Sequence, residues 1–325
     1  MSLSNEFSYF NMSKLIKNTI ITNEASLSIY KAIGVDRVVS ALKSSFTGIE
    51  IIELNSNRVL YSLSSAHELN DVMVFNDNNS VAFITTSART SCVKVWHFNT
   101  HKRAKVIFKD SYRVDNIRRI VGSKGKEYIG IYSHLFDLKV LDPENGKLVA
   151  IIRDDKRNNN YYRLSQLDNG NLTCYATQPG LGVSNDVFLY TFALNGQIIN
   201  EQTVGTTDFG ETNSNLVCGG GYIGRNLFAI GYYTGQVGLW DISDTKEPVY
   251  IIDNNDENVV DQIERISDTL FASSSGDKVN IWCHDTLTIV ETISLEGGSI
   301  QIRALGENRL AMSSSKENVK VVEFE

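Results

Sequence analysis

The chain has 325 residues, of which 42% are hydrophobic and 21% are charged, and its formal net charge at pH 7 is −7. This composition can build a core and argues against long disordered stretches, while the acidic balance disfavours nucleic-acid binding by the molecule as a whole. Residues 1–13 lack the apolar run of a signal peptide, and no stretch of about 18 apolar residues occurs, so no leader or membrane-spanning helix is expected.

The cysteines are spread along the chain without a C-x-x-C pair. They are Cys92, Cys174, Cys218 and Cys283. This spacing disfavours both a disulfide framework and a zinc site. Small buried thiols are typical of a reducing compartment, so we expect an intracellular protein, cytoplasmic or nuclear.

The first predicted element is a strand over residues 15–21 (LIKNTII), preceded by an N-terminal extension over residues 1–13. From there one local pattern repeats seven times: a strand of small apolar residues, a tight turn, an alternating strand with a large apolar landmark, a polar hairpin and a further strand. The landmarks are Ile52, Trp96, Val140, Tyr190, Trp240, Trp282 and Val322. A period of roughly 40–45 residues with four strands per unit indicates a β-propeller.

The strands before these landmarks mix bulky apolar residues with Ala, Gly, Ser or Cys. In chain order they read VVSALKS, VAFITTS, EYIGIYS, NLTCYAT, LFAIGYY, LFASSS and RLAMSSS. Small side chains suit strands that are squeezed between wedge-shaped blades. Asn145-Gly146 and Asn195-Gly196 mark tight hairpins after the third strands, and no helical pattern of useful length occurs.

The last repeat stops at residue 325 without an outer strand, whereas residues 15–21 form a strand with no repeat of their own. We therefore expect residues 15–21 to pair with residues 319–324 and complete the last blade, which would remove an exposed sheet edge. The fold class predicted is all-β: one seven-bladed propeller of four-stranded antiparallel blades over residues 14–325.

Three third strands, VKVW, VGLWD and VNIW, resemble the signature of WD-repeat proteins, and the segment ASSSGDKVNIW comes closest to the wider consensus. The resemblance implies structural roles for five residues, namely Trp96, Trp240, Asp241, Asp277 and Trp282. Only Trp240-Asp241 gives the full dipeptide. The family's Gly-His is hinted at only by Ala66-His67 and its turn Asp survives only as Asp277, so the buried His–Ser–Asp–Trp network of that family is expected to be largely absent. Apolar packing must then hold most blades together.

Several short motifs give little support for a nucleotide or metal site. Residues 219–224 (GGGYIG) match G-x-G-x-x-G, but a strand follows where a dinucleotide site needs a helix. His97 and His101 lack partners at metal-binding spacing, and the acidic run over 253–261 lacks the glycine of a calcium loop. No cofactor and no metal are therefore expected.

Charge is segregated along the chain. Residues 101–126 hold nine Lys or Arg and two Asp, while residues 244–268 hold eight acidic residues and two basic ones. Two loops that join a fourth strand to the next first strand should be neighbours on one face. They supply the candidate binding residues Lys109, Tyr112, Arg113, Arg153, Lys156, Arg157, Tyr161, Tyr162 and Arg163. Arginine and tyrosine are enriched at binding hot spots, although a merely solvated surface explains the same charges.

No nucleophile elbow, metal constellation or paired-carboxylate motif indicates an enzyme. We expect a non-enzymatic scaffold or adaptor, a subunit of a larger complex that binds one or more proteins or peptides, and an acidic or phosphorylated peptide would suit the basic face. The alternative is a basic-patch binder of RNA or of anionic phosphoinositide lipid. Arg118-Arg119 is similar to the arginine pair of lipid-binding propellers but lacks the flanking Phe and Gly.

Overall fold

The computed structural model describes most of the chain from residue 15 to residue 324. The described residues are 15–21, 29–34, 36–42, 48–56, 58–65, 67–87, 90–100, 103–114, 116–132, 137–152, 160–177, 186–206, 217–243, 247–253, 258–298, 300–306, 308–314 and 319–324. In them, 28 strands form seven four-stranded antiparallel sheets, and one short 3-10 helix, η1, spans Ser123–Gly125. The predicted all-β propeller with seven blades is confirmed.

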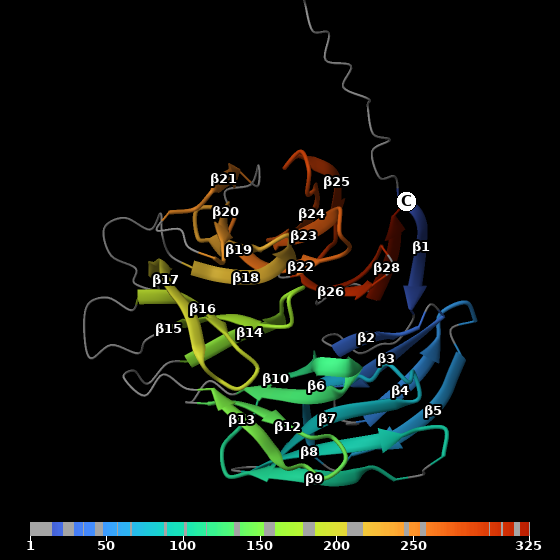
Figure 1. Ribbon diagram of the computed structural model, residues 1–325. Coiled ribbons are helices and arrows are strands. Elements are labelled where there is room, and N and C mark those ends of the chain that lie inside the picture. The colour runs from blue at the N-terminus through green and yellow to red at the C-terminus, as the bar shows by residue number, and fades with distance from the viewer. Residues whose placement is uncertain are drawn as a thin grey trace, which may run out of the picture.

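Within the first six blades the strands pair in chain order from the ring centre outwards, and in the seventh β26, β27 and β28 do so with β1 outermost (Figure 1). The first strands are β2 (Ile29–Ile33), β6 (Glu68–Val74), β10 (Asn116–Val121), β14 (Asn160–Gln166), β18 (Val217–Gly224), β22 (Val260–Arg265) and β26 (Gln301–Gly306). The second strands are β3 (Arg37–Leu42), β7 (Ser80–Ser87), β11 (Glu127–Tyr132), β15 (Leu172–Thr177), β19 (Leu227–Tyr232), β23 (Leu270–Ser275) and β27 (Arg309–Ser313). The third strands are β4 (Gly48–Glu53), β8 (Thr90–His97), β12 (Leu138–Leu141), β16 (Asp186–Phe192), β20 (Gln236–Asp241), β24 (Lys278–Cys283) and β28 (Val319–Phe324).

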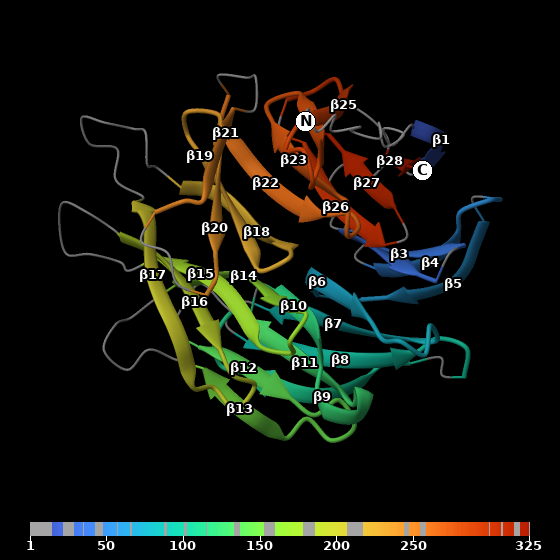
Figure 2. The same ribbon diagram turned by 45° about the horizontal axis from the view of Figure 1, so that its top comes forward.

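The outer strands are β5 (Arg58–Ser64), β9 (Lys105–Asp110), β13 (Leu148–Ile152), β17 (Ile198–Thr206), β21 (Tyr250–Asp253), β25 (Ile289–Ser294) and, for the seventh blade, β1 (Leu15–Ile21). β1 lies antiparallel to β28, with Ile21 opposite Val319 and Leu15 opposite Phe324. Figure 2 shows the same ring of blades from a second direction, with β1 beside β28. The strand from the start of the chain therefore lies in the blade built by its end.

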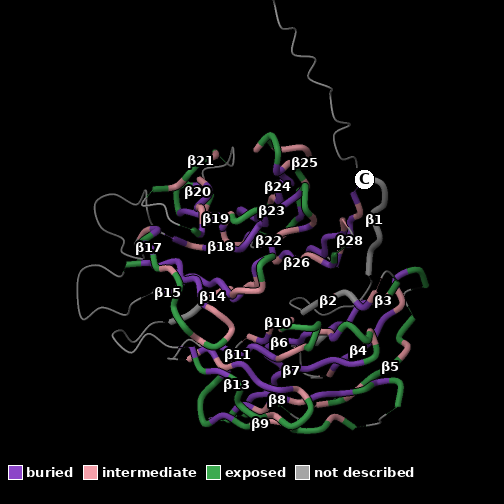
Figure 3. Tube along the Cα trace, in the orientation of Figure 1, coloured by how far each residue is buried: buried purple, intermediate pink, exposed green. Residues whose placement is uncertain are grey.

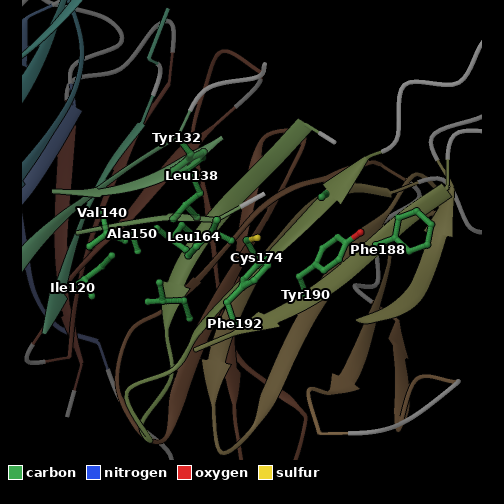
Figure 4. Close-up of a cluster of buried hydrophobic side chains, with 13 residues drawn as sticks. Ile120, Tyr132, Leu138, Val140, Ala150, Leu164, Cys174, Phe188, Tyr190 and Phe192 are labelled. Carbon is green, nitrogen blue, oxygen red and sulfur yellow. The ribbon is translucent and has the colours of Figure 1, made fainter. Parts of the chain in front are cut away.

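The core lies between the blades. All seven landmark residues are on third strands, and each is at most 4% exposed. Burial is concentrated on the inner three strands of each blade, while the outer strands carry most of the exposed residues that lie in strands (Figure 3). In Figure 4, the β12 residues Leu138 and Val140 belong to one buried cluster with Leu164, Tyr190 and Phe192 of the next blade. Apolar side chains from facing sheets thus hold neighbouring blades together, as in any sheet-on-sheet core.

The residues with predicted structural roles divide into two groups. Trp96, Trp240 and Trp282 are 2%, 4% and 2% exposed, and the Trp282 indole N–H donates to the Ser273 hydroxyl at 2.9 Å. Asp241 is half-buried, and its side chain accepts hydrogen bonds from Ser243. Asp277 is exposed, so only the tryptophans are core residues.

At the inner rim, polar side chains cross from one blade to the next. The Asp71 carboxylate of β6 accepts from the Ile117 backbone N–H of β10 at 3.1 Å, and Gln262 accepts from Ile302 N–H at 3.0 Å. Gln166 accepts from Val121 N–H at 2.8 Å and donates to the carbonyl of the same residue at 2.6 Å. A first strand has no further strand on its channel side, so these side chains satisfy its edge backbone groups.

The fifth blade approaches the sixth unusually closely. A Cβ added at Gly219 would lie 2.4 Å from the Asp261 carbonyl oxygen, and one at Gly221 would lie 2.7 Å from the Ile263 carbonyl oxygen. Only glycine allows such contact between β18 and β22. The G-x-G-x-x-G segment is thus strand β18, followed by strand β19, and its glycines serve packing.

Candidate functional site

The end of β9 and the turn that joins it to β10 carry three of the predicted binding residues. Lys109, Tyr112 and Arg113 are all exposed, and Tyr112 is 55% exposed. Arg113 lies 3.6 Å from Glu68, in a pair whose side chains are both more than half exposed. An ion pair of that kind contributes little to stability. These side chains are therefore displayed to solvent.

Buried polar residues fix the shape of this turn. Asp110 is 7% exposed and accepts from the Lys139 ammonium at 2.6 Å and from Tyr112 N–H at 3.1 Å. At the other end, Val114 N–H donates to the Ser91 hydroxyl at 2.8 Å, and the Val114 carbonyl accepts from the Asn70 amide at 2.6 Å. The turn is anchored on both sides of Tyr112, which lowers the conformational entropy lost when a partner binds.

The second predicted loop is described only in part. Arg153, Lys156 and Arg157 fall outside the described residues, as does the side chain of Tyr161. The expectation that Arg163 and Tyr162 lie in a loop is wrong, because both are in strand β14. The Tyr162 ring stacks on Tyr175 with centroids 5.3 Å apart. Leu164 of the same strand is buried against the neighbouring blade.

Arg163 instead belongs to a cluster of charged residues at the ring centre, one from each first strand except β18. The cluster consists of Lys31, Asp71, Arg118, Arg163, Glu264 and Arg303. Arg163 has φ of 53° and lies where the register between β14 and β15 shifts. A bulge of this kind redirects a side chain, here toward the channel. The fifth blade contributes glycines in place of a charge.

Two carboxylates organise the cluster. Asp71 accepts from the Arg118 guanidinium at 2.8 Å, and its side chain is 4% exposed. Glu264 binds two arginines through the same oxygen, Arg303 at 2.7 Å and Arg163 at 3.2 Å. These pairs join β6 to β10 and β14 to β22 and β26, so they cross blade boundaries and the channel. With four cations and two anions, the cluster has a formal charge of +2 when Lys31 is protonated.

Burial and mutual charge shift the ionisation of the cluster. Burial alone would raise the pKa of Glu264, but Arg303 and Arg163 outweigh it and lower that pKa to about 2. Burial likewise opposes ionisation of Asp71, yet Arg118, Lys31 and the other neighbouring charges hold its pKa below the ordinary value. Lys31 is the opposite case: burial, reinforced by Arg118 and Arg303, lowers its pKa to about 7.

Sequence reasoning missed this cluster, although a signal was present. Each of six first strands has a charged residue inside an otherwise strand-like run: IYKAI, ELNDVMV, NIRRIV, NYYRLSQ, VDQIER and QIRALG. A charge in the interior of a buried strand is rarely tolerated without a partner. An alignment of the repeats on their first strands would have shown that these charged residues occupy similar positions, and would have predicted that they meet in the channel.

The remaining motifs contribute no second site. The His97 ring nitrogen Nδ1 pairs with the Ser80 hydroxyl, and His101 falls outside the described residues. Within the described part of the chain, no group of three or more His, Cys, Asp or Glu residues could hold a metal. There too, no helix has the length and apolar character needed to cross a membrane.

Half of the eight described cations in the basic segment over residues 101–126 are in ion pairs. The pairs are Arg113 with Glu68, Arg118 with Asp71, Arg119 with Glu127 and Lys126 with Asp142. Arg118 and Arg119 are both in β10, where Arg118 faces the channel. The pair therefore does not stand together on an outer edge.

Comparison with known proteins identifies the fold. No protein-family model matches the sequence, and no curated protein matches it. Among solved structures, the RRP9 WD40 repeats superpose with a TM-score of 0.70 at 13% identity, over 96% of this chain and 100% of that one. U3-55K gives 0.69 at 13% identity, over 94% and 98% respectively. Raptor from Chaetomium thermophilum gives 0.70 at 12% identity over 94% of this chain, which spans only 28% of the Raptor chain.

The protein is thus a seven-bladed β-propeller with the fold of WD40-repeat proteins, as the tryptophan-bearing third strands predicted. On that fold the described residues form the anchored turn that displays Tyr112 and the charged cluster at the ring centre.

Proposed function

We propose that this protein is a non-enzymatic interaction module, a subunit or adaptor that binds another protein through the face carrying the β9–β10 turn. The observation that carries the proposal is the anchored turn itself. It presents an exposed tyrosine between two exposed cations on a backbone held by Asp110 and Ser91. Rigid aromatic and arginine side chains are the residues that dominate binding energy at protein interfaces.

The chemistry of this turn favours an acidic or phosphorylated segment as the partner. Lys109 and Arg113 offer charge, the guanidinium can form two parallel hydrogen bonds with a carboxylate or phosphate, and Tyr112 offers apolar area with a polar end. The RNA or phosphoinositide alternative fits less well. It needs a broad basic surface, and three of the cations that follow the turn, Arg118, Arg119 and Lys126, are held in ion pairs.

The test compares the wild-type protein with a variant carrying Tyr112→Ala and Arg113→Glu. Both side chains are exposed, so folding should be unchanged, because such substitutions usually alter stability by less than about 0.5 kcal/mol. The matched control carries Tyr250→Ala and Arg58→Glu, the same chemistry on exposed outer strands.

Proteins captured from native cells by the wild-type protein are first identified by mass spectrometry and then purified for affinity measurement. We expect the turn variant to weaken binding about tenfold or more and the control to leave it unchanged. Equal binding by the turn variant would contradict the proposal. A steep loss of binding to RNA or anionic vesicles as salt rises, with no protein partner, would favour the alternative.

A further inference from the structure

A cavity of about 560 Å³ opens at one end of the channel. Its wall includes Gly34, Asn78 and Gly306, which lie in or beside the turns that lead from first to second strands in three blades. The β9–β10 turn joins β10 at its other end. The cavity and the displayed turn are therefore on opposite faces of the ring, and a ligand at one does not touch the other.

Three cations line this cavity, and one of them has no counter-ion. Arg118 is paired with Asp71, and Arg119 lies 3.6 Å from Glu127. Lys31 lines the cavity beside them, and among the residues that the structure describes it has no acidic partner within ion-pair distance. The remaining lining residues are Gly34, Asn78 and Gly306 together with the apolar Met73, Val74, Phe75, Ile117, Ala304 and Leu305, so polar and apolar atoms share the wall. Cavities of this size that combine apolar side chains with convergent polar groups are typical of small-molecule sites.

We propose that this cavity binds a small phosphate monoester, with the phosphate group between Lys31 and Arg118 and the organic part against the apolar wall. A phosphate dianion would balance the formal +2 of the central cluster. It would also serve as the counter-ion of Lys31, because the two carboxylates of the cluster, Asp71 and Glu264, already form ion pairs with three arginines. The site is independent of the function proposed above.

The proposal predicts a distinctive pH dependence. Lys31 is surrounded by Arg118 and Arg303, which oppose its protonation, and by Asp71 and Glu264, which favour it; burial and the arginines prevail, and its pKa is about 7. A phosphate monoester loses its second proton near pH 6 and stays a dianion above that value. Between pH 7 and pH 8.5 the ammonium is therefore lost while the ligand stays unchanged. Affinity should fall about 15-fold over this interval, in proportion to the protonated fraction of Lys31.

The experiment measures binding of phenyl phosphate to the full chain by calorimetry at pH 7 and pH 8.5. Lys31→Met should weaken binding at pH 7 by roughly ten- to a hundredfold, the range for losing a charge-assisted hydrogen bond, and should make the affinity nearly independent of pH. Lys31→Arg should restore binding and keep it at pH 8.5, because a guanidinium stays protonated there. The control Lys124→Met removes the same charge from an exposed position in the short helix η1 and should behave like the wild type.

Two further arms identify the source of the ligand. A phosphotyrosyl peptide that binds more tightly than phenyl phosphate would assign the group to a phosphorylated residue of a partner, and a peptide that binds more weakly would assign it to a free metabolite. Either outcome supports the site. Absence of phenyl phosphate binding at millimolar concentration, or equal binding by a folded Lys31→Met protein, would overturn it. Changing Tyr112 and Arg113 should leave phenyl phosphate binding intact, so failure here is distinguishable from failure of the proposed interaction face.

Discussion

Replacing Glu264 by glutamine keeps the size and shape of the side chain but removes its charge. This change should lower the free energy of unfolding strongly. The carboxylate of Glu264 is the shared counter-ion of Arg163 and Arg303, and its side chain is 20% exposed. Lowering the pKa of a carboxyl from 4.5 to about 2 corresponds to about 3 kcal/mol of stability at neutral pH, at about 1.4 kcal/mol for each pH unit. Removing one partner of a buried ion pair costs about 3–5 kcal/mol, which agrees.

The sign of the pH dependence follows from the direction of the shift. Because the folded-state pKa is depressed, the contribution of Glu264 is fully present above about pH 5 and is lost as the pH falls toward about 2. The difference in unfolding free energy between wild type and Glu264→Gln should therefore be about 3 kcal/mol at pH 7. It should shrink to between about 1 and 2 kcal/mol at pH 3.

Urea unfolding followed by tryptophan fluorescence at the two pH values measures this difference. Glu247→Gln, at an exposed position, is the control and should change little. A variant with Glu264→Gln and Arg303→Gln together should recover part of the loss, because fewer buried cations then lack a counter-ion. A difference at pH 7 below about 0.5 kcal/mol, or one that does not shrink in acid, would refute the role assigned to this carboxylate.

Three further predictions concern packing and placement. Trp282→Ala should lower the unfolding free energy by about 3–5 kcal/mol, and an unchanged urea midpoint would show that the ring is not core. Gly219→Ala should cost about 1–3 kcal/mol in the same assay, since its methyl group would meet the Asp261 carbonyl; no loss would mean that β18 can move away freely. Arg163→Glu should unfold at clearly lower urea than Arg113→Glu, because it puts a second carboxylate beside Glu264; equal midpoints would place Arg163 outside the cluster.

The sequence was sufficient to predict the blades because blade packing is local and periodic. Each third strand repeats a large apolar residue at similar spacing, and the strand before it alternates in a way that only a half-buried or buried strand can satisfy. Trp96, Trp240 and Trp282 stood out for this reason and are buried. The exposed Asp277 shows the limit of this reasoning, because a family pattern gives the position of a residue without showing that its partners are present.

The charged cluster could not be predicted from the periodic pattern of the repeats. Arg163 and Glu264 are 101 residues apart and meet only because the fourth and sixth blades both place their first strands along the channel. Arg163 was assigned to a basic loop because charge in a polar stretch usually marks solvent. A register shift in β14 reverses that expectation by pointing the side chain inward. Such irregularities depend on backbone geometry that composition and periodicity do not encode.

The side chains that cross between first strands also limit how such a ring can evolve. Duplication or exchange of whole blades is the simplest way to lengthen or diversify a repeat protein, and it succeeds when each unit contacts its neighbours in the same way. Here β10 receives a carboxylate from Asp71 on one side and an amide from Gln166 on the other. A transplanted third blade would arrive with unpaired backbone groups at its inner edge unless both neighbours came with it. The inheritable unit of this propeller is therefore a blade together with the polar residues of the blades on either side.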